Sequence, residues 1–390
     1  MSHSIQHSRA AISAVFFLAG MCFASWASRI PDISLKLGLS EGELGQLLLA
    51  VPVGSLLALP PAGWLVHRWG SRQVLLLAAG LYSVALPLLG LADRFWRLAP
   101  ALALFGLASN LVNIAVNTQA IGVQAHHDRP IMGSFHGLWS LAGFLSGAFA
   151  TLLISWHLSP LPHFLIIMTV GLAIIGVAHR YTLRHDEGRE AGGLAWRRPD
   201  PYLLRIGLIA FCGMLCEGTM FDWAGVYFQR VVRPGPALVT SGYVACMGTM
   251  ALGRFAADAL THRFGATRVL QLSSALISVG LLLAVALPYL LPALLGFGLV
   301  GFGIAAVVPL SYSAAGQAGS MAPGPALALV SSISFTGFLL GPPLIGFLAE
   351  ASSLRVSLAF VALVGAGIGL LAARSRPRKA YLTVPQKLAG

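Results

Sequence analysis

Five ionisable side chains lie inside long apolar runs of the sequence: Arg29, Glu217, Asp222, Arg254 and Asp258. A charge in a bilayer costs about 2.5–3.5 kcal/mol on insertion scales, so each of these residues needs a partner or a wet cavity. Glu217 lies nearest the middle of its run. Because a carboxyl group held away from water can exchange a proton near neutral pH, we predict that Glu217 carries a proton, with Asp222 as the second candidate. The alternative is a hydrogen-bonded glutamate with a structural role.

The depth and spacing of these residues predict two ion pairs. Arg29 and Asp222 lie toward the same end of their runs, as judged from a rise of about 1.5 Å per residue. We expect them to pair across the molecule, and the alternative is that each pairs locally or extends to the membrane interface. Arg254 and Asp258 are spaced i, i+4, which places both on one face of a helix. These two can pair with each other.

Neutral polar side chains form a second set of candidates. Asn110, Asn113 and Asn117 fall on one helix face, and unsatisfied amides are expensive in lipid. They predict either a hydrogen-bonding wall of a cavity or contacts between helices. His136, Trp139 and Ser140 share a face of the next run, where an indole and polar groups suit stacking on, and bonding to, a small polar ring. Tyr312 is a weaker candidate for the same cavity.

Residue patterns of an enzyme are lacking in the sequence. We find no nucleophile–base pair and no metal-ligand cluster, since His126-His127 has no further ligands nearby. The Gly296–Gly301 stretch matches the spacing of a dinucleotide fingerprint, but it lies in an apolar run without a preceding strand. We interpret it as a close-packing helix surface. We therefore expect no catalytic residues, no metal and no cofactor.

The elements that must position these residues are membrane-spanning helices. The chain has 390 residues, of which 57% are hydrophobic and 10% charged, against about 25% charged residues in a soluble domain. A span needs roughly 20 apolar residues, so the length accommodates about twelve. The expected spans are 10–33, 43–66, 73–92, 98–122, 131–156, 161–179, 202–228, 238–260, 269–289, 291–315, 325–348 and 354–374.

The distribution of basic residues predicts the topology. Of the 25 Lys and Arg residues, 17 lie in the connecting segments or near the ends of the spans on the side that holds both termini. Six lie on the opposite side (Lys36, Arg94, Arg97, Arg230, Arg233 and Arg355), and Arg29 and Arg254 lie within spans. The positive-inside rule then predicts that both termini are cytoplasmic. The net charge of +12 reflects this topology rather than binding to nucleic acid.

An internal repeat divides the chain into two halves. The stretch LVHRWGSRQVL at Leu65–Leu75 recurs as LTHRFGATRVL at Leu260–Leu270, in each case between the second and third spans of its half. We predict an N-terminal six-helix bundle (1–179), a cytoplasmic linker (180–201), a C-terminal six-helix bundle (202–374) and a basic cytoplasmic tail (375–390). The fold class is an all-α integral membrane protein with two pseudo-symmetric bundles.

Several motifs give the chain a family resemblance. GWLVHRWGSR at Gly63–Arg72 resembles the loop motif of the major facilitator superfamily, although His67 stands where that motif usually carries Asp. Four further stretches resemble fucose-permease-like members and a group of bacterial inner-membrane relatives: Phe23–Ile33, Gly133–Gly143, Glu217–Phe228 and Gly341–Gly346. The resemblance implies two bundles that rock about a site at the membrane midplane, as is general for transporters of this superfamily.

The resemblance, together with the polar residues, leads to an expectation of function. We expect a monomeric secondary transporter in the bacterial inner membrane, moving a small polar solute such as a carbohydrate as a proton symporter. Its solute site would include Asn110, Asn113, Asn117, His136, Trp139, Ser140 and Tyr312. Gating would involve Arg29, Asp222, His67, Arg68, Arg254 and Asp258. The alternative functions are a proton-coupled efflux pump for amphipathic compounds and, from another class, a membrane enzyme or sensor.

Overall fold

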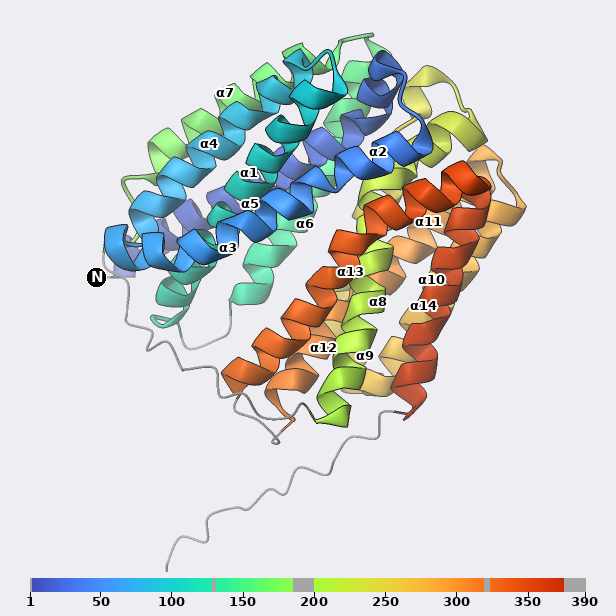
Figure 1. Cartoon of the computed structure of the whole chain (residues 1–390). Coiled ribbons are helices and arrows are strands. Elements are labelled where there is room, and N and C mark those ends of the chain that lie inside the picture. The colour runs from blue at the N-terminus through green and yellow to red at the C-terminus, as the bar shows by residue number, and fades with distance from the viewer. Residues whose placement is uncertain (1, 128–130, 185–199, 319–322, 375–390) are drawn as a thin grey trace, which may run out of the picture.

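The computed structural model describes residues 2–127, 131–184, 200–318 and 323–374. Most of the expected linker (185–199) and the expected tail (375–390) lie outside these residues. The described parts of the chain are helical, and the helices form two groups that stand side by side (Figure 1).

The N-terminal half contains seven helices that make six membrane-crossing segments, because α2 and α3 follow one another as one bent span. Their bounds are α1 (Ser2–Leu37), α2 (Glu41–Leu48), α3 (Ala50–Trp69), α4 (Ser71–Leu91), α5 (Phe95–Gln124), α6 (Met132–Ser155) and α7 (Pro160–Ala178).

The C-terminal half follows the same plan, with its fourth span divided into α11 and α12. Its elements are α8 (Pro201–Tyr227), η1 (Phe228–Val232), η2 (Pro236–Leu238), α9 (Ser241–Phe264), α10 (Ala266–Ala286), α11 (Leu290–Ile304), α12 (Val307–Gly316), α13 (Pro323–Ala351) and α14 (Leu354–Arg374).

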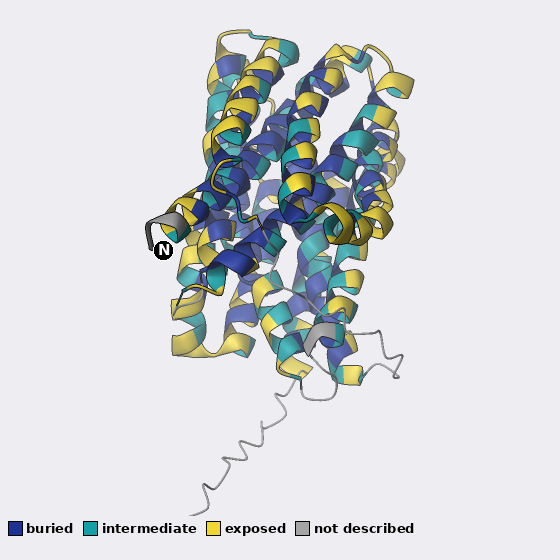
Figure 2. Cartoon of the chain, turned by 90° about the vertical axis from the view of Figure 1, so that its left-hand side faces the viewer, coloured by how far each residue is buried: buried dark blue, intermediate teal, exposed yellow. Residues whose placement is uncertain are grey.

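The lengths and hydropathy of these helices confirm the expected fold class. In the described residues, 11 segments are long and apolar enough to cross a membrane. The remaining long helix, α9, has 24 residues but carries Arg254 and Asp258, which lower its hydropathy. Large apolar side chains face outward on many helices, such as Leu57 on α3 and Leu363 on α14. Figure 2 shows exposed residues on the outer faces of helices whose inner faces are buried. The exposed apolar faces suit contact with lipid tails.

Two of the spans are broken at the same kind of sequence feature. A proline has no N–H to donate to the carbonyl four residues earlier. Pro52 leaves the carbonyl of Leu48 without its helical donor, and α2 ends at Leu48. Pro309 does the same to Ala305, in the turn between α11 and α12. A carbonyl left free by a proline therefore lies at the division of both spans.

The repeated motif adopts the same backbone conformation in both halves. Gly70 ends α3 with φ 81° and ψ 150°, and Gly265 ends α9 with φ 81° and ψ 152°. A side chain is strained at this positive φ, so glycine is required in both copies. The helices that follow, α4 and α10, both have 21 residues. The repeat in the sequence is thus a repeat in the structure.

Each half has two ends, which we name for the positions of its helices. The linker end is where α1 and α8 begin and where α7 and α14 finish, and the opposite end is the far end. At the far end α2 of the first half lies against α13 of the second (Figure 1). A methyl group on Gly346 would lie 2.6 Å from the Glu41 carbonyl oxygen and 2.8 Å from the Gly45 Cα. The two helices therefore touch at backbone distance, which only glycine permits.

A second contact between the halves joins α6 to α9. The contact begins at the far end with a hydrogen bond of 2.6 Å between Thr151 and Thr240. It continues through Gly147 against Tyr243 and Gly143 against Met247, and it extends to Gly137, which faces Phe255. Toward the linker end beyond Gly137, α6 has only a further turn and a half. The halves are therefore joined from the far end to a level below the middle of these helices.

Candidate functional site

An ion pair between α8 and α9 is the centre of the candidate site. The Arg254 Nη2 donates to the Glu217 Oε1 at 2.9 Å, and Glu217 is 7% exposed. Both residues lie on helices of the C-terminal half. A buried ion pair is stable only if its remaining polar atoms also have partners.

The further partners of Arg254 come from the N-terminal half. Its Nη1 donates a short hydrogen bond to the Ser140 hydroxyl on α6, and its guanidinium lies over the Trp139 ring at 5.7 Å from the centroid. The Ser140 hydroxyl donates in turn to the His136 carbonyl oxygen at 3.1 Å. Two of the three residues expected to share a face of this span, Trp139 and Ser140, therefore contact Arg254 of the second half, while the His136 ring packs against Phe16 of its own half. The cluster crosses the boundary between the halves.

The pairing of Arg254 corrects one expectation. Arg254 does not pair with Asp258 on its own helix but with Glu217 on the preceding one. Asp258 is exposed one turn nearer the linker end. The guanidinium is drawn instead toward the buried boundary between α6 and α8, where it finds a carboxylate, a hydroxyl and an aromatic face together. The i, i+4 spacing permitted a pair but did not require one.

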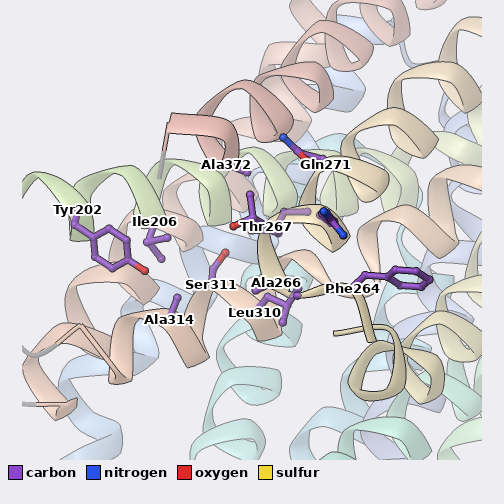
Figure 3. Close-up of a pocket in the computed structure, with 13 residues that line it drawn as sticks. Tyr202, Ile206, Phe264, Ala266, Thr267, Gln271, Leu310, Ser311, Ala314 and Ala372 are labelled. Carbon is purple, nitrogen blue, oxygen red and sulfur yellow. The ribbon is translucent and has the colours of Figure 1, made fainter. Parts of the chain in front are cut away.

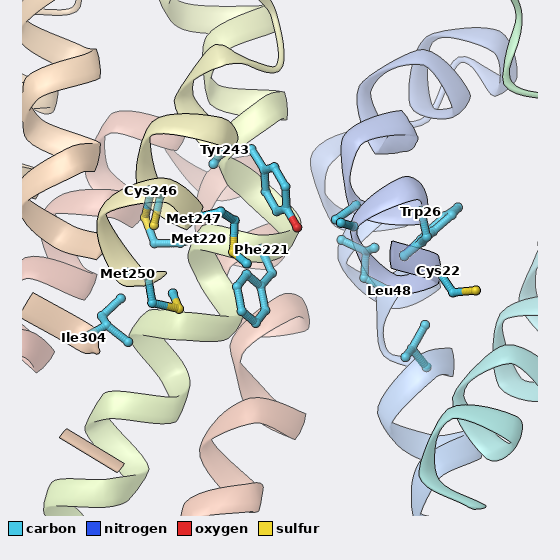
Figure 4. Close-up of a cluster of buried hydrophobic side chains, with 14 of the residues drawn as sticks. Cys22, Trp26, Leu48, Met220, Phe221, Tyr243, Cys246, Met247, Met250 and Ile304 are labelled. Carbon is cyan, nitrogen blue, oxygen red and sulfur yellow. The ribbon is translucent and has the colours of Figure 1, made fainter. Parts of the chain in front are cut away.

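Four aromatic rings lie beside the ion pair. Phe23 on α1 is 5.2 Å from Phe221 on α8 and 6.0 Å from Trp139, measured between ring centroids. Phe221 lies 6.5 Å from Tyr243 on α9. In Figure 4 the side chains of Phe221 and Tyr243 extend from the second half toward α1. We call Phe23, Trp139, Phe221 and Tyr243 the aromatic layer. It joins the two halves directly beside the charged cluster.

Asp222 lies next to the aromatic layer rather than in an ion pair. It is 8% exposed and directly follows Phe221 of that layer on α8. Among the described residues, no cation lies within ion-pair distance of Asp222. The Tyr243 hydroxyl is also buried, with no hydrogen-bond partner in the described part of the chain. Asp222 and Glu217 thus have different surroundings, although both lie on α8.

The partners of Arg29 correct the other expected pair. Its Nη1 lies 2.5 Å from the Asp32 Oδ2, and its Nε donates to the His163 Nδ1 on α7 at 3.2 Å. Arg29 is 1% exposed. It therefore pairs inside the N-terminal half and not with Asp222, although the halves are in contact at this end. The reason is proximity, since Asp32 lies one turn further along α1 and His163 faces α1 from the start of α7.

Asp32 and His163 are polar residues that the sequence analysis did not select. The spacing of Arg29 and Asp32, i and i+3, is itself a signal for a pair on one helix face. No comparable signal identifies His163, because its contact with Arg29 joins positions 134 residues apart. Together the three residues form a polar cluster within one half.

The asparagines of α5 lie apart from the charged cluster. Asn110 donates to the Ser55 carbonyl oxygen on α3 at 2.6 Å, which is a contact between helices. Asn117 donates to the Asn113 side-chain oxygen at 2.8 Å, and Asn113 is exposed. Tyr312 shares a hydrogen bond of 2.9 Å with Ser334 on α13. The structure does not bring these residues together with Glu217.

The motif residues His67 and Arg68 lie at the linker end. Both lie near the end of α3, and the Arg68 guanidinium stacks over the Trp64 ring at 5.8 Å. In the second copy the corresponding Arg263 also stacks on an aromatic ring, but on that of the next residue, Phe264, at 5.2 Å. Gly296 and Gly301 confirm their interpretation as packing positions, because a methyl group on them would meet the Gly280 and Cys246 carbonyl oxygens.

Comparisons with known proteins agree with this architecture. The family model described as Major Facilitator Superfamily matches residues 12–323. An uncharacterised MFS-type transporter of Yersinia pestis is 34% identical over 349 residues, covering 90% of this chain and 91% of the relative.

Solved structures share the fold at low sequence identity. A bacterial homologue of the human lysosomal transporter Spinster, inward-facing and unoccupied, has a TM-score of 0.69 at 14% identity over 95% of this chain and 97% of that one. The nucleoside transporter NupG has a TM-score of 0.70 at 11% identity over 94% and 98%. The MFS transporter FucP, in the outward conformation, has a TM-score of 0.63 at 16% identity over 95% and 98%. With its two repeated six-span halves and its family match across most of its length, this chain belongs to the major facilitator superfamily of membrane transporters, which are not enzymes.

Proposed function

We propose that this protein is a proton-coupled symporter of a small neutral polar solute, a monomer in a bacterial inner membrane with both termini in the cytoplasm. The proposal includes the division into bundles 1–179 and 202–374. The observation that carries it is the ion pair of Glu217 and Arg254, which contacts Ser140 and Trp139 of the other half. A charged pair at such a boundary is sensitive both to protons and to movement of the halves.

The chemistry of the pair suggests how a proton could be coupled to movement. A proton that binds the Glu217 carboxylate removes its negative charge and weakens its hold on Arg254. The guanidinium then retains Ser140 and Trp139, on the opposite half, as its nearby partners. The carboxylate belongs to one half, and the hydroxyl and the ring belong to the other. Protonation of Glu217 therefore changes how strongly Arg254 is bound to each half. A solute hydroxyl that replaces Ser140 or Glu217 as a partner of Arg254 would change these two interactions in the same way.

The contacts between the halves support an inward-open conformation in this proposal. The halves touch at the far end, where Arg230 bridges to Glu41 at 2.7 Å and to the Ser34 hydroxyl at 2.9 Å. With cytoplasmic termini the far end faces the periplasm, so the pathway is closed on that side. The likeness to the inward-facing Spinster homologue is consistent with this assignment.

The surroundings of the pair favour a ring-shaped polar solute. Trp139 and Phe23 offer faces for stacking, while Ser140, His136 and the charged pair offer hydrogen bonds. The same combination suits sugars and nucleosides, and NupG is described as a nucleoside transporter. In this proposal Asn113, Asn117 and Tyr312 line the approach from the linker end. The aromatic layer is the observation that favours the alternative, export of amphipathic compounds.

Proton flux in proteoliposomes tests the proposal. Neutral sugars, nucleosides and lipophilic cations are added outside vesicles that carry a pH-sensitive dye, and the wild type is compared with Glu217→Gln. Asp93→Asn is the matched control, because Asp93 is an exposed carboxylate that pairs only with Arg94 and Arg97 among the described residues.

For a symporter, a sugar or nucleoside should lower the pH inside the vesicles in the wild type and in Asp93→Asn but not in Glu217→Gln. Proton flux with the lipophilic cations alone would support the efflux alternative. Solute-driven flux that is unchanged in Glu217→Gln would overturn the role of Glu217.

A further inference from the structure

A cavity of about 620 Å³ lies in the C-terminal half at the linker end, away from Glu217 and Arg254. Figure 3 shows its lining side chains, which come from α8, the end of α9, α10, α12 and α14 and include Tyr202, Ala266, Gln271, Leu310, Ala314 and Ala372. The lining is mainly apolar, with a few hydroxyl and amide groups and one charged residue, Arg268. None of the roles assigned above uses this space.

The corresponding place in the N-terminal half is filled by the chain itself. The segment after α7, residues 179–184, folds back against α4 and α5. The Leu183 N–H donates to the Gln119 Oε1 at 2.8 Å, and the Gln119 Nε2 donates to the Leu183 carbonyl oxygen at 3.1 Å and to the Ser71 hydroxyl at 2.7 Å. One glutamine therefore satisfies both backbone groups of Leu183 and ties them to the start of α4.

Other contacts hold this segment on each side. Tyr181 stacks on His7 of α1 with ring centroids 5.2 Å apart, and Thr182 is buried. The Arg72 Nη2 donates to the His179 carbonyl oxygen at 2.6 Å. Leu183 packs so closely on α5 that a methyl group on Gly122 would lie 2.7 Å from its Cδ1. The segment thus closes the linker end of the first half.

The cavity in the second half lies among the counterparts of these residues. Ser71 is the first residue of α4, and Ala266 is the first residue of α10. Gln119 and Ala314 occupy equivalent positions when counted from the first residues of α5 and α11. Ala178 and Ala372 occupy equivalent positions on α7 and α14. Ser71 and Gln119, which bond to each other and hold Leu183 in the first half, are therefore replaced by alanines in the second. The space they leave is the cavity.

We propose that the segment following α14, which begins at Ser375, docks in this cavity. It is the counterpart of residues 179–184, and it leaves α14 beside Ala372, which lines the cavity. It also carries side chains of a suitable kind, since Tyr381-Leu382-Thr383 has the same composition as Tyr181-Thr182-Leu183. At about 3.3–3.6 Å per residue, the eight residues from Arg374 to Leu382 reach well beyond the end of α14.

The mode of docking differs between the halves. In the first half, hydrogen bonds from Gln119 fix the backbone. In the second, Ala314 offers no such bonds, so binding depends on burying Tyr381 and Leu382 against Leu310, Ala314 and Ala372. Such a contact is reversible, and when made it ties the end of α14 to α10 and α12.

Cysteine crosslinking in membranes tests the proposal. A cysteine at Tyr381, Leu382 or Val384 is combined with Ala314→Cys in a background where the four native cysteines are replaced by alanine. The matched control replaces Leu204, which is exposed on the lipid-facing side of α8 at the same end. The pair Gly122→Cys and Leu183→Cys, in the same background, reports that the protein is folded.

We expect roughly tenfold more crosslinked product with Ala314→Cys than with Leu204→Cys for at least one tail position, because a tethered segment with a preferred site has a high effective concentration there. Ala266→Phe, which fills the cavity, should abolish this difference while the 122–183 crosslink persists. Equal yields at positions 314 and 204 would overturn the proposal. A phospholipid retained in native mass spectra of the purified wild type, and lost in Ala266→Phe, without any tail crosslink would assign the cavity to lipid instead.

Discussion

The two halves of the molecule share a fold but use their membrane-embedded charges differently. In the first half, Arg29, Asp32 and His163 bond to one another inside a single bundle. In the second, Glu217 and Arg254 pair at the boundary, and Arg254 also contacts Ser140 of the first half. A cluster within one bundle keeps its partners when the bundles move as rigid bodies, whereas a cluster across the boundary cannot. The difference indicates a structural role for the first cluster and a coupling role for the second.

The largest expected effect comes from removing the cation of the boundary cluster. Arg254→Gln leaves the Glu217 carboxylate without its partner, and breaking a buried pair in this way costs about 3–5 kcal/mol. Each factor of ten corresponds to about 1.4 kcal/mol, so this loss corresponds to at least about two factors of ten. We therefore expect solute uptake in proteoliposomes to fall at least about 100-fold. Arg263→Gln, which changes an exposed arginine near the end of the same helix, is the control and should retain uptake.

A double variant separates stability from coupling at this site. Glu217→Gln combined with Arg254→Gln removes both charges, so its thermal stability should recover toward that of the wild type. Its proton-coupled uptake should stay absent. If the double variant recovers uptake with proton flux, the Glu217–Arg254 pair has only a structural role. The charged clusters of the two halves would then not differ in function.

A smaller effect on transport is expected from the cluster inside the first half. Arg29→Gln leaves Asp32 and His163 without their shared partner, and we expect about 3 kcal/mol of lost stability from this buried charge network. Because the cluster does not cross the boundary, uptake per folded molecule should change by less than about twofold. Denaturation in detergent measures the stability, and uptake normalised to folded protein measures the function. Loss of coupling at normal stability would show that both halves take part in coupling.

The smallest expected change in free energy concerns the contact that closes the far end. Arg230 joins the halves through Glu41, Ser34 and the Leu39 carbonyl oxygen at 2.8 Å. Hydrogen bonds to a charged group contribute about 1.5–3 kcal/mol, so Arg230→Gln should raise the population open at the far end roughly tenfold. A cysteine at Thr240, which is buried at the far end and bonds to Thr151 of the other half, reports this opening through its rate of labelling by an impermeant maleimide. Arg233→Gln is the control, because the Arg233 side chain bonds only within its own turn among the described residues. An unchanged labelling rate in Arg230→Gln would exclude Arg230 as a lock.

Much of the fold could be predicted from the sequence because its causes are local. A run of apolar residues long enough to span a bilayer identifies a helix without knowledge of its neighbours. The repeat of Leu65–Leu75 at Leu260–Leu270 predicted equivalent turns, and Gly70 and Gly265 have nearly identical dihedral angles. Most of the charged residues in the spans were also identified, since each is conspicuous among apolar neighbours, but Asp32 and His163 were not selected.

The partners of those residues could not be predicted, because they depend on which helix faces share a boundary. Arg254 had a candidate one turn away in Asp258, yet its carboxylate partner is Glu217 on another helix. Arg29 had a candidate at equal depth in Asp222, yet it pairs with Asp32 and with His163 across the bundle. Depth and spacing determine where the Cα of a residue lies. The long side chain of an arginine can reach several possible partners from that position. The rotation of each helix about its axis, which the sequence pattern leaves open, decides among them.

The low hydropathy of α9 has a consequence for how the protein enters the membrane. On insertion scales the arginine of this helix alone costs about 2.5–3.5 kcal/mol, and α9 is the long helix that falls outside the 11 apolar spans of the described chain. The carboxylate that neutralises Arg254 lies on α8, which is made immediately before it and is joined to it by the short stretch from η1 to Thr240. The two helices are therefore suited to leave the insertion machinery as a hairpin. The residues proposed to couple protons would then first serve to bring their own helix into the bilayer.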